Sequence, residues 1–197
     1  MSVGRPRAVE ILIFDGVEVL DFAGAFEVFS LAAQLAEVPP WEVVLVAETL
    51  RVHTAVNGLQ VMPNRVIDGK ALPAVLVVPG GEGTRALLSV APVIAWLGQA
   101  VAAAEVTLSI CSGARLLGAV GALEGRAFAT HHTVIDELAA AYPSAVPRTD
   151  LRFVDTGRVV TTGGISAGID GSLHLVGRLL GAAQAQRVAD YMEYPYS

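Results

Sequence analysis

The sequence contains a single cysteine, Cys111, within the stretch VTLSICSGARLLGAVGAL at residues 106–123. The apolar run VTLSI predicts a buried strand, and the segment after the cysteine predicts a helix rich in small residues. The order strand–Cys–Ser–Gly–helix has the shape of the G-x-S-x-G nucleophile elbow, with Ser109 in place of the first glycine. A lone cysteine is more often a buried structural residue, but a sharp strand-to-helix turn presents its side chain to a cleft. We therefore interpret Cys111 as a functional thiol.

Two features next to Cys111 bear on its reactivity. The first backbone N–H groups of a helix are unpaired and attract negative charge. We therefore expect the thiol to have a lowered pKa and to react as a thiolate. Gly113 has no side chain and lets neighbouring backbone approach closely.

Histidine is a common proton acceptor for a cysteine nucleophile, and the sequence has four. The pair His131 and His132 follows the predicted strand RAFAT, so either could line the cleft, and we take His131 as the candidate. His174 lies inside the last predicted helix and is interpreted as structural, whereas His53 is expected at the surface. The sequence has no H-x-x-x-H or C-x-x-C spacing, so no metal site is expected.

A carboxyl group in the stretch GVEVLDFAGAFEVF is the second candidate for chemistry. Asp21 could be the N-cap of the first helix, a position that favours Asp. Alternatively it lies in the cleft, where Leu20 and Phe22 would raise its pKa and help keep it protonated. It could then exchange a proton with the thiol. Glu18 in the same loop is a competing acid, and the sequence does not choose between them.

Glycines follow two further predicted strands, Gly80 and Gly81 after one and Gly163 and Gly164 after the other, and we expect these loops to meet those that carry Asp21 and Cys111. Gly80 and Gly81 present N–H groups without side chains, which an anionic intermediate needs, and the N–H groups of Gly81 and Ser112 are the predicted pair. A simple turn is the alternative for Gly-Gly. Asp170, near the start of the last helix, is interpreted as a helix cap or an anchor for neighbouring loops.

The candidate residues lie in loops between predicted strands and helices, which can hold them in position. Strands alternating with helices predict an α/β fold with a doubly wound, mostly parallel sheet, whose ligand site lies beyond the carboxyl ends of its strands. Strands are predicted at 8–14, 41–48, 74–81, 106–110 and 126–130, an extended arm at 59–64, a hairpin at 151–162, and helices at 22–36, 91–104, 113–123, 133–141 and 169–185.

Composition limits the class of protein. The 197 residues suit one domain, 1–197, and 53% of them are hydrophobic, which buried parallel sheets require. The net charge of −6 argues against a nucleic-acid surface. The first apolar run stops at Asp15, too short for a signal peptide or a membrane span. A single cysteine suits a reducing compartment, so we expect a cytoplasmic protein that does not bind membranes.

Four stretches together, ILIFDGVEVLDFAGAFEVF, VLVVPGG, LSICSGARLLGAVGALEGRAFATHH and TTGGISAGIDGSLHLV, resemble the DJ-1/ThiJ/PfpI superfamily. The resemblance implies a flavodoxin-like sandwich, related to class I glutamine amidotransferases, a nucleophile-elbow cysteine and usually a homodimer. Protease-like members carry His directly after the cysteine, where this chain has Ser112. The LD-x-x-G pattern around Asp21, the hydroxyl residue after the cysteine, the G-x-x-AGID pattern and the tail VADYMEYPY are most similar to the isonitrile hydratase subgroup.

That resemblance implies a function and a set of roles. Cys111 would be the nucleophile, Asp21 the acid and base, and Ser112 the hydroxyl beside the thiol. The enzyme would add water to a small-molecule isonitrile through a thioimidate and would need no cofactor. The alternatives are a glyoxalase or deglycase acting on small dicarbonyls, and a ligand- or redox-sensing module related to the N-terminal domains of AraC-type regulators. The chain ends soon after the last predicted helix, so no DNA-binding helix-turn-helix is expected.

Overall fold

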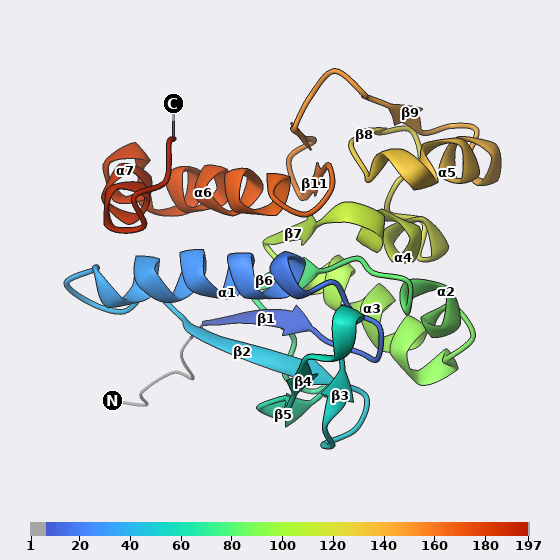
Figure 1. Ribbon diagram of the computed structural model, residues 1–197, viewed down its shortest axis with the longest axis horizontal. Coiled ribbons are helices and arrows are strands. Elements are labelled where there is room, and N and C mark those ends of the chain that lie inside the picture. The colour runs from blue at the N-terminus through green and yellow to red at the C-terminus, as the bar shows by residue number, and fades with distance from the viewer. Residues whose placement is uncertain (1–6, 197) are drawn as a thin grey trace.

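The computed structural model describes residues 7–196 and has a seven-stranded sheet at its centre (Figure 1). The strand order is β10-β11-β7-β6-β1-β2-β5, and every neighbouring pair is parallel except β10 with β11. The strands are β1 (Ala8–Leu12), β2 (Glu42–Ala47), β5 (Arg65–Val66), β6 (Val75–Val78), β7 (Val106–Ser109), β10 (Phe153–Asp155) and β11 (Val159–Thr162). The predicted mostly parallel sheet is confirmed, and every residue of β6, β7 and β11 is buried.

Helices and two small strand pairs complete the described part of the chain. The α-helices are α1 (Val19–Gln34), α2 (Thr84–Leu87), α3 (Ala91–Ala103), α4 (Ala114–Ala119), α5 (Ile135–Ala141), α6 (Ala167–Leu180) and α7 (Ala182–Tyr191). Short 3-10 turns are η1 (Val56–Gly58), η2 (Cys111–Gly113) and η3 (His132–Val134). The small pairs are β3 (His53–Thr54) with β4 (Gln60–Val61), and β8 (Ala127–Phe128) with β9 (Val146–Pro147). No helix within residues 7–196 is long and apolar enough to span a membrane.

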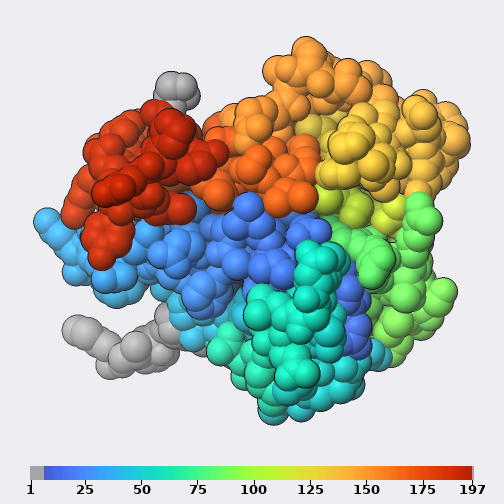
Figure 2. All heavy atoms as spheres, viewed as in Figure 1, coloured from blue at the N-terminus to red at the C-terminus, as the bar shows by residue number. Residues whose placement is uncertain are grey.

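The helices lie in layers against the sheet. α1 contacts β1, β2 and β6, and it also packs against α6 and α7 (Figure 1). In the space-filling view the C-terminal helices cover one side of α1, while the β3–β5 segment forms a lobe at the opposite end of the view (Figure 2). The β1–α1–β2 and β6–α3–β7 crossovers run in opposite directions along the sheet. Right-handed crossovers therefore place α1 and α3 on opposite faces.

Several predicted boundaries differ from the structure for local reasons. The last predicted helix is two helices, because Gly181 adopts a φ of 97° between α6 and α7. The strand predicted at 126–130 pairs only Ala127 and Phe128, and it does so with β9 outside the central sheet. The helix after the cysteine ends at Ala119 rather than at residue 123. His53, expected at the surface, is 4% exposed because it lies in β3 against the main body.

The strand order brings four loops together at one edge of the sheet. The chain runs from β1 to β2 on one side, returns to β6 on the other side of β1, and continues outwards to β7, which is the arrangement of flavodoxin-like sheets. Glu18 N–H donates to Gly80 O at 2.9 Å, and Cys111 N–H donates to Gly163 O at 3.1 Å. The loops after β1, β6, β7 and β11 therefore meet as the sequence predicts.

Candidate active site

Cys111 lies at the sharp turn between β7 and α4. Its φ is 57°, a left-handed conformation that few non-glycine residues adopt. Two hydrogen bonds hold the turn, since Cys111 N–H donates to Gly163 O and Thr130 Oγ1 donates to Cys111 O at 2.8 Å. Strained backbone of this kind persists only where surrounding contacts fix it, and it is concentrated at functional sites. The nucleophile-elbow geometry predicted for Cys111 is present.

Two glycines permit the close packing that the elbow requires. A Cβ atom on Gly113 would lie 2.1 Å from Val78 O, and one on Gly80 would lie 2.5 Å from Ser112 N. Both distances are far below van der Waals contact, so neither position accepts a larger residue without movement of the backbone. Gly113 thus has the close-approach role that the sequence predicts.

Asp21 is completely buried behind the thiol. It lies in the first turn of α1, and Glu18 precedes the helix as its N-cap, accepting a hydrogen bond from Val19 N–H at 3.2 Å. The N-cap alternative for Asp21 is therefore wrong, because α1 begins three residues earlier than predicted. Gly80 N–H donates to Asp21 Oδ2 at 2.8 Å, whereas Oδ1 has no hydrogen-bond partner among residues 7–196.

The surroundings of Asp21 favour its neutral form. Burial raises the pKa of this carboxyl to about 7, against the opposing effect of the Gly80 N–H. The negative charge of Glu18 raises the pKa further, and hydrogen bonding with the Cys111 thiol lowers it. No cation is among these groups. The direction of the pKa shift agrees with the expectation for Asp21, although the carboxyl lies buried behind the thiol rather than in the cleft. A pKa of about 7 equips Asp21 to exchange a proton near neutral pH.

The pKa of Cys111 moves in the direction opposite to the one expected. Burial raises the pKa of the thiol to about 12, and the charge of Asp21 raises it as well. The N–H groups of Ser112 and Ile165 and the Ser112 side chain lower it, but by less. The expected lowered pKa is therefore wrong for the free protein. The helix-start N–H groups do act on the sulfur, but loss of water and a neighbouring carboxylate outweigh them.

The predicted pair of oxyanion donors is also corrected. Gly81 N–H donates to Ser112 Oγ at 2.9 Å, and that hydroxyl donates back to Gly81 O at 3.2 Å. Gly80 N–H is taken by Asp21. Neither glycine N–H is thus available to a substrate. The N–H groups that act on the sulfur belong to Ser112 and Ile165, and Ile165 also has a left-handed φ, of 51°.

Cys111 opens onto a cavity of about 270 Å³. Polar and charged side chains form much of its wall, together with Val134 and Ile165. The lining residues are Glu18, Gly81, Glu82, Arg85, Cys111, Ser112, Arg115, His131, Thr133, Val134 and Ile165. Asp21 is not among these lining residues and lies directly behind the thiol. A small molecule fits the volume.

His131, rather than His132, lines this cavity. Its Nδ1 accepts a hydrogen bond from Thr133 N–H at 3.3 Å, so in the neutral ring the proton is on Nε2. Burial lowers the pKa of His131, and the nearby His132 lowers it further. A Cβ atom on Gly164 would lie 2.2 Å from the His131 ring. The ring is thus held as a neutral hydrogen-bonding group at the cavity wall.

An ion pair between the buried Arg115 and the partly exposed Glu137 was missed by the sequence reasoning. Arg115 is 3% exposed and donates to both carboxylate oxygens of Glu137, at 2.6 and 3.0 Å, and to Thr84 Oγ1 at 2.5 Å. Arg85 also donates to Glu137, at 2.7 Å. Hydrogen bonding to Arg115 lowers the pKa of Glu137 to about 2. One signal was available, because Arg115 lies four positions after Cys111, at the start of the helix that follows the elbow.

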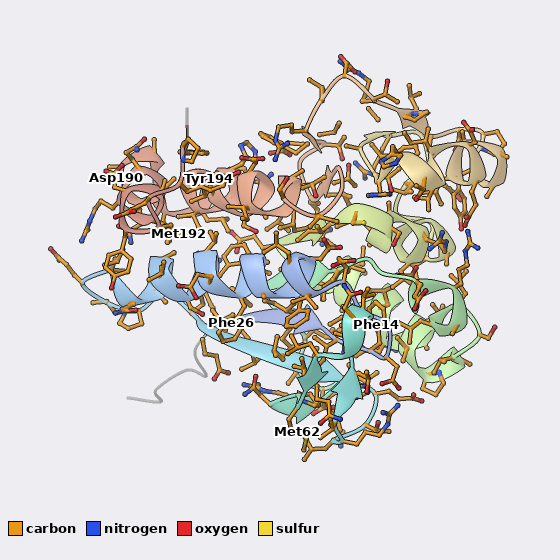
Figure 3. The ribbon with its side chains drawn as sticks, viewed as in Figure 1. Phe14, Phe26, Met62, Asp190, Met192 and Tyr194 are labelled. Carbon is orange, nitrogen blue, oxygen red and sulfur yellow. The ribbon has the colours of Figure 1, made fainter. Side chains whose placement is uncertain are left out.

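Asp170 lies away from the cavity and anchors other segments. Arg152 donates to Asp170 Oδ2 at 2.5 Å, and the Tyr194 hydroxyl donates to Oδ1 at 2.8 Å. Figure 3 shows Tyr194 in the C-terminal tail beside α6. Of the two roles predicted for Asp170, the structure shows the loop anchor.

Comparisons with known proteins agree on one family. A family model described as the DJ-1/PfpI family matches residues 7–177. The isonitrile hydratase of Pseudomonas putida is 34% identical over 94% of this chain and 78% of its own. The HTH-type transcriptional regulator GbdR of Pseudomonas aeruginosa is 26% identical over 96% of this chain, which spans 51% of that regulator. A crystal structure of a ThiJ/PfpI family protein from Pseudomonas syringae matches with a TM-score of 0.86 at 29% identity, over 98% of this chain and 77% of its own.

Proposed function

Since the chain belongs to the DJ-1/PfpI family, we propose that it is a cysteine-dependent hydratase that adds water to an isonitrile and releases an N-substituted formamide. The observation that carries the proposal is the buried pair of Cys111 and Asp21. A thiol at a strained elbow, next to a carboxyl with a pKa of about 7, supplies a nucleophile and a proton carrier in one place. The similarity to isonitrile hydratase supports the choice of substrate.

The first half of the reaction forms a thioimidate. The ionised Asp21 accepts the thiol proton as the sulfur of Cys111 attacks the terminal isonitrile carbon. The carbon then receives that proton, which gives a thioimidate, Cys–S–CH=N–R. The N–H groups of Ser112 and Ile165 act on the sulfur and stabilise the charge that develops as the thiol loses its proton. The thiol therefore needs no lowered pKa, because it loses its proton only as the new bond forms.

The second half of the reaction consumes water. Asp21 accepts a proton from a water molecule that attacks the thioimidate carbon, and the proton passes to the nitrogen. The C–S bond of the resulting tetrahedral adduct, Cys–S–CH(OH)–NH–R, then breaks, and the proton of its hydroxyl group passes by way of Asp21 to the sulfur. The products are R–NH–CHO and the free thiol, so the atoms of one isonitrile and one water are accounted for. Covalent catalysis here replaces one difficult addition by two easier steps.

A ligand-sensing function is the second candidate, because the same chain also matches GbdR over half of that regulator. A redox sensor is disfavoured, since readily oxidised thiols are exposed and have a low pKa, whereas Cys111 is buried with a raised pKa. A sensor would bind a small molecule in the Cys111 cavity without converting it. Formation of lactate or glycolate from a dicarbonyl would instead indicate a glyoxalase-like enzyme.

The deciding experiment supplies an aliphatic isonitrile and measures formamide. We expect turnover by the parent protein and a loss of at least about 10³-fold in kcat/KM for Cys111→Ala. Intact-protein mass spectrometry during turnover should show the substrate mass added to the parent and not to Cys111→Ala. Equal turnover by the two proteins would end the proposal. Saturable binding without any product would support the sensor instead.

A further inference from the structure

A series of hydrogen bonds runs from α4 through α2 to the hydroxyl group beside the thiol. Its members are Arg115, Thr84, Gly81 and Ser112. The helices α2 and α4 that carry Thr84 and Arg115 lie side by side (Figure 1). Both side chains are buried, at 0% and 3% exposure. Neither takes part in the hydration steps, so their effect on the thiol is a separate question.

The direction of these hydrogen bonds is set by a group that can only donate. A guanidinium has no acceptor atom, so Arg115 Nη1 is the donor to Thr84 Oγ1 at 2.5 Å. Glu137 holds the guanidinium in this orientation, because it accepts from Arg115 Nε at 2.6 Å and from Nη2 at 3.0 Å. The hydroxyl hydrogen of Thr84 therefore points away from Arg115, and its acceptor is Gly81 O at 2.7 Å.

Gly81 O has more donors than it can bind well. Thr84 Oγ1 is 2.7 Å away, whereas the Thr84 N–H nitrogen and Ser112 Oγ are both at 3.2 Å. A carbonyl oxygen has two lone pairs, so three donors compete for them. The short contact from Thr84 therefore weakens the hold of Gly81 O on the hydroxyl hydrogen of Ser112.

The Ser112 hydroxyl has a second acceptor within reach. It has a single hydrogen, and the Ser112 side chain also forms a hydrogen bond with the sulfur of Cys111, which lowers the pKa of the thiol. Its oxygen is held in place by Gly81 N–H at 2.9 Å. Gly81 is itself fixed, because a Cβ atom there would lie 2.2 Å from Gly16 O. The hydrogen can thus turn between two acceptors, Gly81 O and the sulfur, while the oxygen stays where it is.

We propose that Thr84, oriented by Arg115, is a positioning residue that directs the hydroxyl hydrogen of Ser112 to the sulfur of Cys111. Thr84 occupies Gly81 O, which leaves the Ser112 hydrogen for the sulfur. There it stabilises the negative charge that develops as the thiol loses its proton. The proposal rests on the proposed role of Cys111 as a nucleophile and adds the residues that act on it from behind the cavity.

The test measures the rate at which iodoacetamide alkylates Cys111 in the full chain at a fixed pH. The thiolate is the reactive form, so this rate reports charge stabilisation at the sulfur without any isonitrile. Ser112→Ala should slow alkylation about tenfold, because a hydrogen bond to a charged group is lost. Thr84→Val has nearly the same shape without the hydroxyl, and it should slow alkylation about threefold or more as the Ser112 hydrogen returns to Gly81 O.

The double variant separates positioning from a general effect on the fold. In the Ser112→Ala background there is no hydroxyl to direct, so adding Thr84→Val should cause no further loss. Thr84→Ser keeps the hydroxyl and should react at the parent rate. Thr107→Val removes a buried hydroxyl of β7 that has no hydrogen-bond partner among residues 7–196, and it should leave the rate unchanged.

A further variant tests the other end of the series. Arg115→Met removes the donor that orients the Thr84 hydroxyl, and it should slow alkylation in the same direction. This variant also decides the matter if Thr84→Val does not fold.

Three results would overturn the proposal. They are a parent-like alkylation rate in Thr84→Val or Arg115→Met, an equal loss from Thr84→Val with and without Ser112, and a failure of Thr84→Ser to match the parent. The test is independent of the hydratase reaction. If the expected alkylation pattern appears in a protein that hydrates no isonitrile, the proposed function fails while the positioning role of Thr84 stands.

Discussion

Two carboxyl groups lie next to residues that line the Cys111 cavity, and their surroundings shift their pKa values in opposite directions. Asp21 is fully buried behind the thiol without a cation, and its pKa rises to about 7. Glu137 is paired with Arg115 and Arg85, and its pKa falls to about 2. The first carboxyl can change its charge near neutral pH, while the second stays ionised. The protein thus keeps one carboxyl for proton transfer and another as a fixed charge.

The same contrast gives opposite effects of pH on stability. Asp21 has a folded pKa above its ordinary value of 3.8, so its ionisation weakens the fold as pH rises from about 4 to 7. Glu137 has a folded pKa below its ordinary value of 4.5. Its contribution to stability is therefore complete above pH 4.5 and is lost as pH falls towards 2. Replacing each carboxyl group by its amide tests whether Asp21 transfers a proton and whether Glu137 stabilises the fold.

The largest effect is expected for Asp21→Asn. The amide can still accept a hydrogen bond from Gly80 N–H, so the fold should be retained, but it cannot carry a proton from the thiol. We expect kcat/KM for an aliphatic isonitrile to fall by about 10²- to 10⁴-fold. Glu27→Gln, a matched change at an exposed position of the same helix, should keep parent activity. Asp21→Asn with parent activity would remove Asp21 from the mechanism.

Glu137→Gln should reduce stability more than activity. Arg115 is 4% exposed in its side chain and would lose its charge partner, while Glu137 is 39% exposed and partly screened by water. We expect the free energy of unfolding at pH 7 to fall by about 2 kcal/mol, as measured by urea denaturation. The difference from the parent should shrink as pH drops from 4.5 towards 2. If the difference in unfolding free energy stayed the same at low pH, the ion pair would not be its source. Glu124→Gln, at an exposed position, serves as the control.

The smallest change is expected for Glu18→Gln. The charge of Glu18 raises the pKa of Asp21, so its removal should move the acid limb of the pH–rate profile to lower pH, with little change in the maximal rate. The same variant decides which acid is used. A loss of activity as large as that of Asp21→Asn would identify Glu18 as the acid instead.

The parts of the site that depend on backbone geometry alone were predicted correctly from sequence patterns. A strand, a cysteine, a small polar residue and a glycine specify the elbow, and the strand order then brings the loops around Gly80 and Gly163 to Cys111. Asp21 was a candidate because it lies between the first predicted strand and the first predicted helix, where the chain passes the carboxyl edge of the sheet. The homodimer and the cytoplasmic location stay predictions.

The missed features depend on side-chain pairing and burial, which no local pattern encodes. The Gly81 N–H was expected to face a substrate, but it bonds to the hydroxyl of Ser112. The thiol pKa was expected to fall, because the sequence shows the helix start but not the loss of water around the sulfur. Arg115 and Glu137 are 22 positions apart, so their pairing appears only in three dimensions.

The pH dependence of kcat/KM for isonitrile hydration tests the central claim most directly. The reactive form has a protonated thiol beside an ionised Asp21, so the rate should rise with pH through a single group with a pKa near 7. This limb should be absent from the residual activity of Asp21→Asn. A limb at the ordinary carboxyl pKa near 4, or the same limb in Asp21→Asn, would contradict the account in which Asp21 takes the proton of Cys111.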